Sequence, residues 1–199
     1  MEHTTNSITL RGSLQELPCF SHENHGRRFL RFHLEVQRLS GAVDILPVIA
    51  EENLLAPLDP TAGNMLTVTG QIRSHNQRTE GARHLLIFVF ASEIIIEDGE
   101  PVNEVLVEGP LCREPNFRKT PLGREITDLL VAVNRSYGKS DYIPCIAWGR
   151  NARYAAGFSV GSNIELWGRV QSREYTKSVG ENQSEKRVAY EVSVSKLGH

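Results

Sequence analysis

Residues 142–172, YIPCIAWGRNARYAAGFSVGSNIELWGRVQS, contain a strand, a helix and a second strand in succession. YIPCIAW (142–148) is apolar and β-rich, and its proline suggests an edge strand or a bulge. GRNARYAAG (149–157) has a helical composition and ends at a glycine, which commonly follows a helix. NIELWGRVQS (163–172) alternates apolar and polar residues, which is typical of a half-buried strand. The inference of the fold depends on this single short helix between two strands.

The chain also contains an internal repeat. When it is shifted by 97 residues, fourteen positions between residues 6 and 50 meet an identical residue. One inserted residue extends the match to Gly70/Gly168 and Ser74/Ser172. We therefore expect two copies of one domain, over residues 1–97 and 103–199, joined by the Glu-Asp-Gly-Glu-Pro segment between them. The identities in the first part include Asn6/Asn103, Gly12/Gly109, Arg38/Arg135 and Asp44/Asp141.

Each copy is predicted to be mostly β, with a helix after the third of five strands. Glycines lie inside the first and fourth strands, where a small barrel must bend. This order fits an OB-fold, a small Greek-key barrel, whereas a β-sandwich would share the alternation but not the helix. We predict an all-β protein of two tandem OB-fold five-stranded Greek-key barrels, each with one short helix. The expected strands are 8–14, 29–36, 44–50, 65–73 and 84–94 in the first copy, and 105–111, 126–133, 142–148, 163–172 and 187–195 in the second.

Charge is distributed unevenly between the two copies. The formal net charge is −2. Residues 1–102 hold eight basic and thirteen acidic side chains, a charge of −5, whereas the remainder holds fourteen and eleven, a charge of +3. Such asymmetry suggests two domains with different partners, or simply drift in solvated surfaces. Three widely spaced cysteines argue against a disulfide scaffold and favour a reducing, cytoplasmic setting.

The second copy resembles the bacterial single-stranded DNA-binding protein (SSB) family. The similarity rests on N-x-V-x-V-x-G-x-L from Asn103, P-x-x-R followed by T-x-x-G, AVNR at 132–135, IPCIAWGRNA at 143–152, and S-R-x-Y at 172–175. The first copy resembles the family more faintly, mainly through the repeat. The resemblance implies sequence-independent binding of single-stranded DNA in replication, recombination or repair. Such binding needs flat aromatic rings for stacking bases and cations along the phosphates.

Four aromatic residues of the second copy match positions where the resemblance implies base stacking. They are Tyr137, Tyr142, Trp148 and Tyr175. Tyr142 and Trp148 are six residues apart, an even number, so both should lie on one face of their strand. An aromatic on a strand is otherwise a core or interface residue, and we interpret Trp167 in that way, as inter-domain or subunit packing.

Basic residues interleave with these aromatics and are candidate phosphate contacts, although each alone is more often a solvated surface charge. The polar segment TKSVGENQSEK (176–186) is expected to be a mobile hairpin loop that orders over bound strand. The candidate phosphate contacts are Arg118, Lys119, Arg124, Arg135, Arg150, Arg153, Arg169, Arg173 and Lys177.

The first copy has lost the four stacking residues. The repeat places Ser40, Ile45, Glu51 and Gln77 at the equivalent positions. Together with its negative charge, this predicts a degenerate domain that serves packing and oligomerisation and binds DNA weakly or not at all. Weak participation stays open, because several arginines are available to follow a backbone. These are Arg27, Arg28, Arg31, Arg38 and Arg73.

The sequence is also consistent with a metal site, an enzyme or a protein-interaction module, each with weaker signals than DNA binding. Cys19, His22 and His25 form C-x2-H-x2-H, which is a possible metal site, but a fourth ligand is not visible and an exposed polar loop is the simpler interpretation. No catalytic pattern stands out, so we expect no enzyme activity, cofactor, small-molecule substrate or membrane partner. The alternative is a primosome-type accessory OB protein that acts mainly through protein partners.

Assembly and location are inferred from the resemblance. SSB-family assemblies usually present four OB-folds, so two per chain imply a homodimer, in the cytoplasm and on the nucleoid. Family members commonly end in a flexible tail with an acidic tip, whereas this sequence ends at SVSKLGH. We therefore expect either a protein that coats DNA without serving as a recruitment hub, or one whose role is specialised or accessory.

Overall fold

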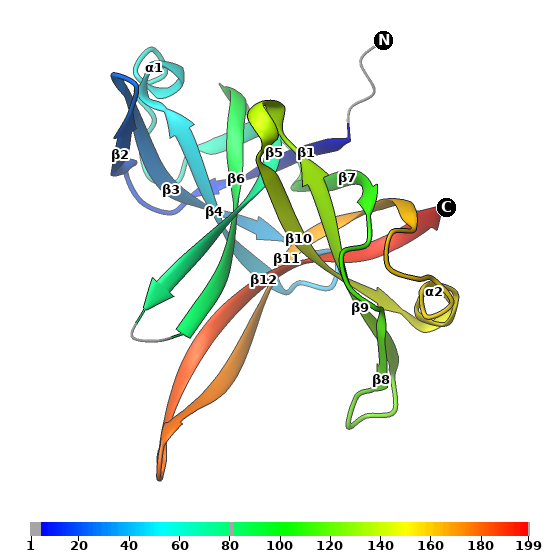
Figure 1. Cartoon of the computed structure of the whole chain (residues 1–199). Helices are drawn as coiled ribbons and strands as arrows, with labels where there is room; N and C mark the ends of the chain where they lie inside the picture. Colours follow the sequence, from blue (N-terminus) through cyan, green and yellow to red (C-terminus); the bar gives the residue numbers. More distant parts are fainter. Residues whose placement is uncertain (1–4, 80–81, 199) are drawn as a thin grey trace.

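The computed structural model describes residues 5–79 and 82–198 and confirms the all-β fold. Two OB barrels follow one another in the chain, and their long hairpins, β5–β6 and β11–β12, project in the same direction (Figure 1). The first barrel consists of β1 (Asn6–Leu14), β2 (Cys19–Asn24), β3 (Arg27–Gln37), β4 (Val43–Glu51), α1 (Glu52–Leu55), β5 (Met65–Thr79) and β6 (Ala82–Ile96). The second barrel consists of β7 (Val102–Pro110), β8 (Asn116–Lys119), β9 (Glu125–Asn134), β10 (Ser140–Trp148), α2 (Gly149–Ala155), β11 (Asn163–Gly180) and β12 (Gln183–Gly198).

Strict alternation along the strands builds each core. Along β1 every second residue is buried, and Ile8, Leu10 and Leu14 are at most 1% exposed. The first barrel closes where β1 pairs with β3, next to the parallel pair β4–β6. The second closes through a single bridge between Leu111 and Val131. Among the described helices, none is long and apolar enough to cross a membrane.

Three local features differ from the sequence prediction. Each barrel has an additional short strand, β2 or β8, which forms a hairpin with the strand after it. The first-copy helix is only the four residues of α1. The segment 176–186 is no long loop, because β11 and β12 stay paired as far as Gly180 and Gln183. Residues 181–182 make the turn, with Asn182 at a φ of 66°.

One strand pair joins the two barrels into a single sheet. β1 and β7 run antiparallel and pair from Asn6↔Val107 to Arg11↔Val102, which links twelve strands. Ile8 pairs with Val105, and these two residues are equivalent in the 97-residue repeat. The barrels are therefore related by a pseudo-twofold axis through this pair, as two identical chains would be in a symmetric dimer.

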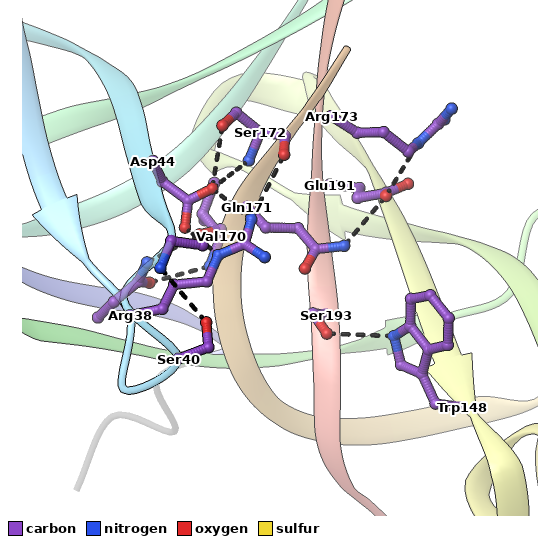
Figure 2. Close-up of polar contacts among 12 residues, drawn as sticks. Arg38, Ser40, Asp44, Trp148, Val170, Gln171, Ser172, Arg173, Glu191 and Ser193 are labelled. Carbon is purple, nitrogen blue, oxygen red and sulfur yellow. Dashed lines mark hydrogen bonds and ion pairs between the residues drawn. The ribbon is translucent and has the colours of Figure 1, made fainter. Parts of the chain in front are cut away.

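A buried carboxylate of the first barrel reaches across this axis. Asp44 is fully buried and accepts two hydrogen bonds of 2.6 Å from the Arg38 guanidinium. It also accepts bonds from the main-chain N–H (2.8 Å) and hydroxyl (2.9 Å) of Ser172 in the second barrel (Figure 2). Burial alone would raise the pKa of Asp44, but the Arg38 and Ser172 hydrogen bonds outweigh it and lower that pKa below its ordinary value.

The second barrel makes the same contact in return. Asp141 is fully buried, is held by the Arg135 guanidinium at 2.5 and 2.6 Å, and accepts a 2.7 Å bond from the main-chain N–H of Ser74. The Ser74 hydroxyl in turn accepts a 2.8 Å bond from the main-chain N–H of Tyr142. We call these two contacts the reciprocal carboxylate contacts. All six of their charged and serine residues are identities of the repeat.

Glycines at equivalent positions permit the close approach of strands at the barrel bends. A Cβ on Gly168 would lie 2.1 Å from the Ser193 carbonyl oxygen, and one on Gly109 would lie 2.1 Å from that of Ala132. No side chain fits at such a distance without a backbone shift. This explains why both glycines recur in the repeat, and it confirms the predicted bends.

Replacing Gly168 with alanine should destabilise the protein by about 1–3 kcal/mol, because the added methyl group forces β11 away from β12. The matched control is Gly157→Ala, whose Cβ would have its nearest neighbour at 3.5 Å, an ordinary contact. Urea unfolding of both variants tests this. Equal stability of the two would contradict it.

Acid should weaken the contact between the barrels. The folded-state pKa of Asp44 is lowered, so its contribution is complete above the unfolded value of about 3.9 and is lost as pH falls through the folded value. Asp44→Asn should cost about 3–5 kcal/mol, because it leaves Arg38 with a weakened partner in a buried pair. It should also flatten the dependence of stability on pH below about 4.

The control for this prediction is Asp128→Asn. Asp128 binds Arg118 at 2.7 Å, but its side chain is 25% exposed, and a surface pair contributes only about 0–1 kcal/mol. Thermal unfolding between pH 3 and pH 7 compares the two variants. If both variants lost the same stability and showed the same dependence on pH, the Asp44 contact would contribute no more to stability than a surface ion pair.

Candidate nucleic-acid interface

The outer face of β10 carries two of the four predicted stacking residues. Tyr142 and Trp148 alternate with the buried Ile143, Cys145 and Ala147, so they share the face opposite the core. Tyr142 is 38% exposed. Each pairs with a residue of β9, Tyr142 with Ala132 and Trp148 with Ile126. The two rings therefore lie on a continuous sheet surface, as their spacing predicts.

Trp148 is held at its edge by a polar contact. Its Nε1–H donates a 3.2 Å hydrogen bond to the hydroxyl of Ser193 on β12 (Figure 2). The ring is partly buried, and its residue ends the strand directly before α2. A ring fixed in this way loses little conformational entropy when a base stacks on it.

Tyr137 extends from the turn between β9 and β10. The side chain is fully exposed, and the residue has a φ of 68°, in the left-handed region. That conformation costs a non-glycine residue about 1–2 kcal/mol. Exposed aromatics in strained turns are typical of binding sites rather than of folding requirements.

Tyr175 lies apart from the other three, on the long β11–β12 hairpin. It pairs with Arg187, and the Arg173 guanidinium lies 5.8 Å from its ring centroid. Its ring lines a groove between this hairpin and the β5–β6 hairpin, together with Leu86 and Lys177. The hairpins also touch directly, because Arg187 donates to His84 at 3.1 Å.

Four of the nine candidate phosphate contacts are engaged with carboxylates. These ion pairs are Arg118–Asp128 (2.7 Å), Arg135–Asp141 (2.5 Å), Arg153–Glu125 (2.5 Å) and Arg173–Glu191 (3.3 Å). The remaining five form no ion pair within residues 5–79 and 82–198, namely Lys119, Arg124, Arg150, Arg169 and Lys177. Arg169, however, lines the same cleft as Glu100 and Glu104.

The first barrel has aromatic residues that the repeat comparison missed. His22 stacks on Phe29 with centroids 4.7 Å apart and an interplanar angle of 7°. Phe29 in turn contacts Phe90 at 5.9 Å, and the Arg73 guanidinium lies over the Phe90 ring at 4.7 Å. These rings occupy positions that are not equivalent to the second barrel's stacking residues, so comparing position by position does not find them.

The C-x2-H-x2-H residues do not converge. His22 is engaged with Phe29, Cys19 accepts a 3.4 Å bond from Arg31, and His25 sits in the β2–β3 turn with a φ of 49°. In the described part of the chain, no three metal-ligating side chains come together.

Known proteins resemble this chain in sequence and in fold. The profile of the single-strand binding protein family matches residues 102–198. Single-stranded DNA-binding protein B of Bacillus subtilis is 32% identical over 87 residues, which cover 40% of this chain and 77% of that protein. Single-stranded DNA-binding protein 2 of Listeria innocua is 35% identical over 86 residues, 40% of this chain and 54% of that protein. The chain thus spans about half the length of several curated relatives that it matches.

A solved structure extends the likeness to both barrels. The chain superposes on a deletion mutant of the single-stranded DNA-binding protein from Thermus aquaticus with a TM-score of 0.79, covering 100% of this chain and 95% of that one. Identity is 21%, so this likeness concerns the fold. A tandem OB-fold chain with an aromatic outer face on its second barrel is the class that the structure defines. The chain belongs to the single-strand binding protein family.

Proposed function

We propose that this protein binds single-stranded DNA without sequence preference, through the outer face of its second barrel. The observation that carries the proposal is the placement of Tyr142 and Trp148 on one face of β10, with the indole fixed by Ser193. Every base has a π-face, so stacking on such rings tolerates any sequence and contributes about 1–3 kcal/mol per base. Tyr137, in the turn before β10, and Tyr175, on the β11–β12 hairpin, supply further stacking positions outside this face.

Phosphates are neutralised by the cations around this face. Lys119, Arg124, Arg150 and Lys177 are free of ion pairs in the described structure and rank first as contacts. Arg118, Arg153 and Arg173 contribute by exchanging a carboxylate for a phosphate. Arg135 and Arg169 are less well supported as phosphate contacts, since Arg135 is paired with Asp141 and Arg169 lines a cleft that also contains two glutamates.

The first barrel acts chiefly as architecture in this proposal. Its Ser74 hydroxyl receives the N–H of Tyr142, so the first barrel positions a stacking residue of the second. Binding is non-covalent, no step requires a cofactor, and we place it in DNA replication, recombination or repair on the cytoplasmic nucleoid. The accessory protein-interaction role is less well supported, because the aromatic face is retained.

Trp148→Ala should weaken binding of a fluorescein-labelled oligo-dT by about tenfold or more, since one stacked base contributes about 1–3 kcal/mol. Anisotropy titrations at several salt concentrations measure affinity and the salt slope, which steepens by about 0.7 for each phosphate neutralised. The slope should change little in this variant, because no cation is removed.

Tyr154→Ala is the matched control. Tyr154 is also an exposed aromatic, at 51%, but it lies on α2 and packs edge-on against Phe158. Its loss should leave DNA affinity at the wild-type level. An unaltered affinity in Trp148→Ala, or no binding by the wild type at low salt, would refute the proposed function.

We also propose a homodimer that presents four OB-folds. Leu106 of β7 and Trp167 of β11 pair side by side on the face of the joined sheet opposite the cores, and the Lys196 ammonium lies 4.3 Å from the Trp167 ring. A leucine and a tryptophan side by side on the outer face of a sheet suit contact with a second copy of the same chain. This retains the interpretation of Trp167 as a packing residue.

Leu106→Lys should convert the dimer to a monomer of 22.3 kDa, because a charge is buried at the centre of the interface. Light scattering coupled to size exclusion measures the mass. The control is Leu39→Lys, at a fully exposed loop position, which should remain dimeric. A monomeric wild type would rule out this assembly.

A further inference from the structure

The pseudo-twofold axis generates two clefts between the barrels. The first, of about 770 Å³, is lined by His25, Gln71 and Arg73 of the first barrel and by Arg135, Tyr137 and Lys139 of the second. We call it the junction cleft. The second, of about 840 Å³, is lined by the equivalent segments and includes Arg38, Arg169, Glu100 and Glu104. We call it the counter cleft. Their similar size follows from the repeat.

The two clefts differ in charge. Among the described residues, the junction cleft is lined by Arg73, Arg135, Lys139 and one carboxylate, Asp141, which already binds Arg135 and Ser74. The counter cleft, by contrast, is lined by two arginines and two glutamates. The junction cleft is therefore suited to an anion, whereas the counter cleft, of similar volume, has equal numbers of arginines and glutamates in its lining.

Arg73 is the unusual residue of the junction cleft. Its guanidinium lies over the Phe90 ring, and Nη2 donates to the Gln71 side-chain oxygen at 2.9 Å. Nε is buried and has no hydrogen-bond partner in the described structure. Burial, followed by the nearby charge of Arg135, lowers the pKa of Arg73. A buried donor without a partner costs about 1–3 kcal/mol, which an incoming anion would recover.

The second barrel has an uncharged residue at the position equivalent to Arg73. Gln171 stands where the first barrel has Arg73, and it donates to Glu191 at 3.2 Å (Figure 2). The register places Phe88 opposite Arg73, where Glu191 lies opposite Gln171. The first barrel thus has a cation in place of an amide and a phenyl ring in place of its acidic partner. Within the described part of the first barrel, no carboxylate forms an ion pair with Arg73.

We propose that the junction cleft holds a backbone phosphate of the bound DNA strand, with Arg73 as its contact in the first barrel and Lys139 as its contact in the second. The exposed ring of Tyr137 stands at the same cleft, so a base stacked there carries its phosphate toward both cations. The strand then crosses from one barrel to the other at this point. This inference rests on the proposed function and extends it to the first barrel.

Arg73→Gln tests the proposal, and its folding is protected because glutamine is the residue at the equivalent position, Gln171. Anisotropy titrations with labelled oligo-dT should show a salt slope smaller by about 0.7, the value for one lost phosphate contact. Affinity for long oligonucleotides should fall severalfold at low salt. An oligonucleotide of about 8 nucleotides, which one OB-fold can hold alone, should bind as it does to the wild type.

Two further variants complete the experiment. Arg78→Gln removes the same charge from the same strand but outside the cleft, at an exposed position, and should keep the wild-type slope. Lys139→Ala, also exposed, should reproduce the loss of slope without any risk to the core. Thermal unfolding of each variant shows that the protein remains folded.

The outcomes separate this inference from the proposed function. If Arg73→Gln and Lys139→Ala matched Arg78→Gln while Trp148→Ala lost binding, the phosphate site would be wrong and the second-barrel interface would stand. If Arg73→Gln affected short and long oligonucleotides equally, the crossing between barrels would be overturned. If the wild type failed to bind any oligonucleotide, both would fall together.

Discussion

Two buried carboxylates fix how the two barrels lie against each other. Asp44 and Asp141 have no access to solvent, and each is satisfied by an arginine of its own barrel and a serine of the other. A buried charge is tolerated only when its hydrogen bonds are complete, so each barrel needs the other to finish its own interior. The contacts are specific in geometry, and they fix how β5 and β11 lie against the opposite barrel.

The position of the candidate binding face depends on the same contacts. Ser74 bonds with Asp141 through its main-chain N–H and with Tyr142 through its hydroxyl, so one residue of the first barrel touches both the structural carboxylate and a candidate stacking residue. Any shift between the barrels would therefore move Tyr142. This links the stability of the pair to the geometry of the site.

Much of the fold was visible in the sequence, for identifiable reasons. The repeat located both barrels, and alternation along β10 placed Tyr142 and Trp148 on one face. Some identities of the repeat have a clear structural reason, since Gly109 and Gly168 permit close-packed strands and the Arg38–Asp44 and Arg135–Asp141 pairs are buried. Surface ion pairs were harder to predict from the sequence. Asp128 and Arg118, for example, lie on different strands, so their pairing depends on the register between those strands. The regular β11–β12 hairpin was mistaken for a loop because its polar residues face solvent on both sides. The aromatic rings around Phe90 lie at positions that are not equivalent to the second barrel's stacking residues. The repeat therefore does not predict them.

The pairing of β1 with β7 inside one chain has a consequence for how the two halves can differ. In a dimer of identical chains, both clefts would be copies, and any change at one would appear at the other. A covalent connection also makes their association intramolecular, so dilution cannot separate them. Joined in this way, the halves are free to specialise. The presence of Arg73 in one barrel and Gln171 in the other is an asymmetry that two identical chains cannot have, and it makes the two ends of the barrel pair chemically different.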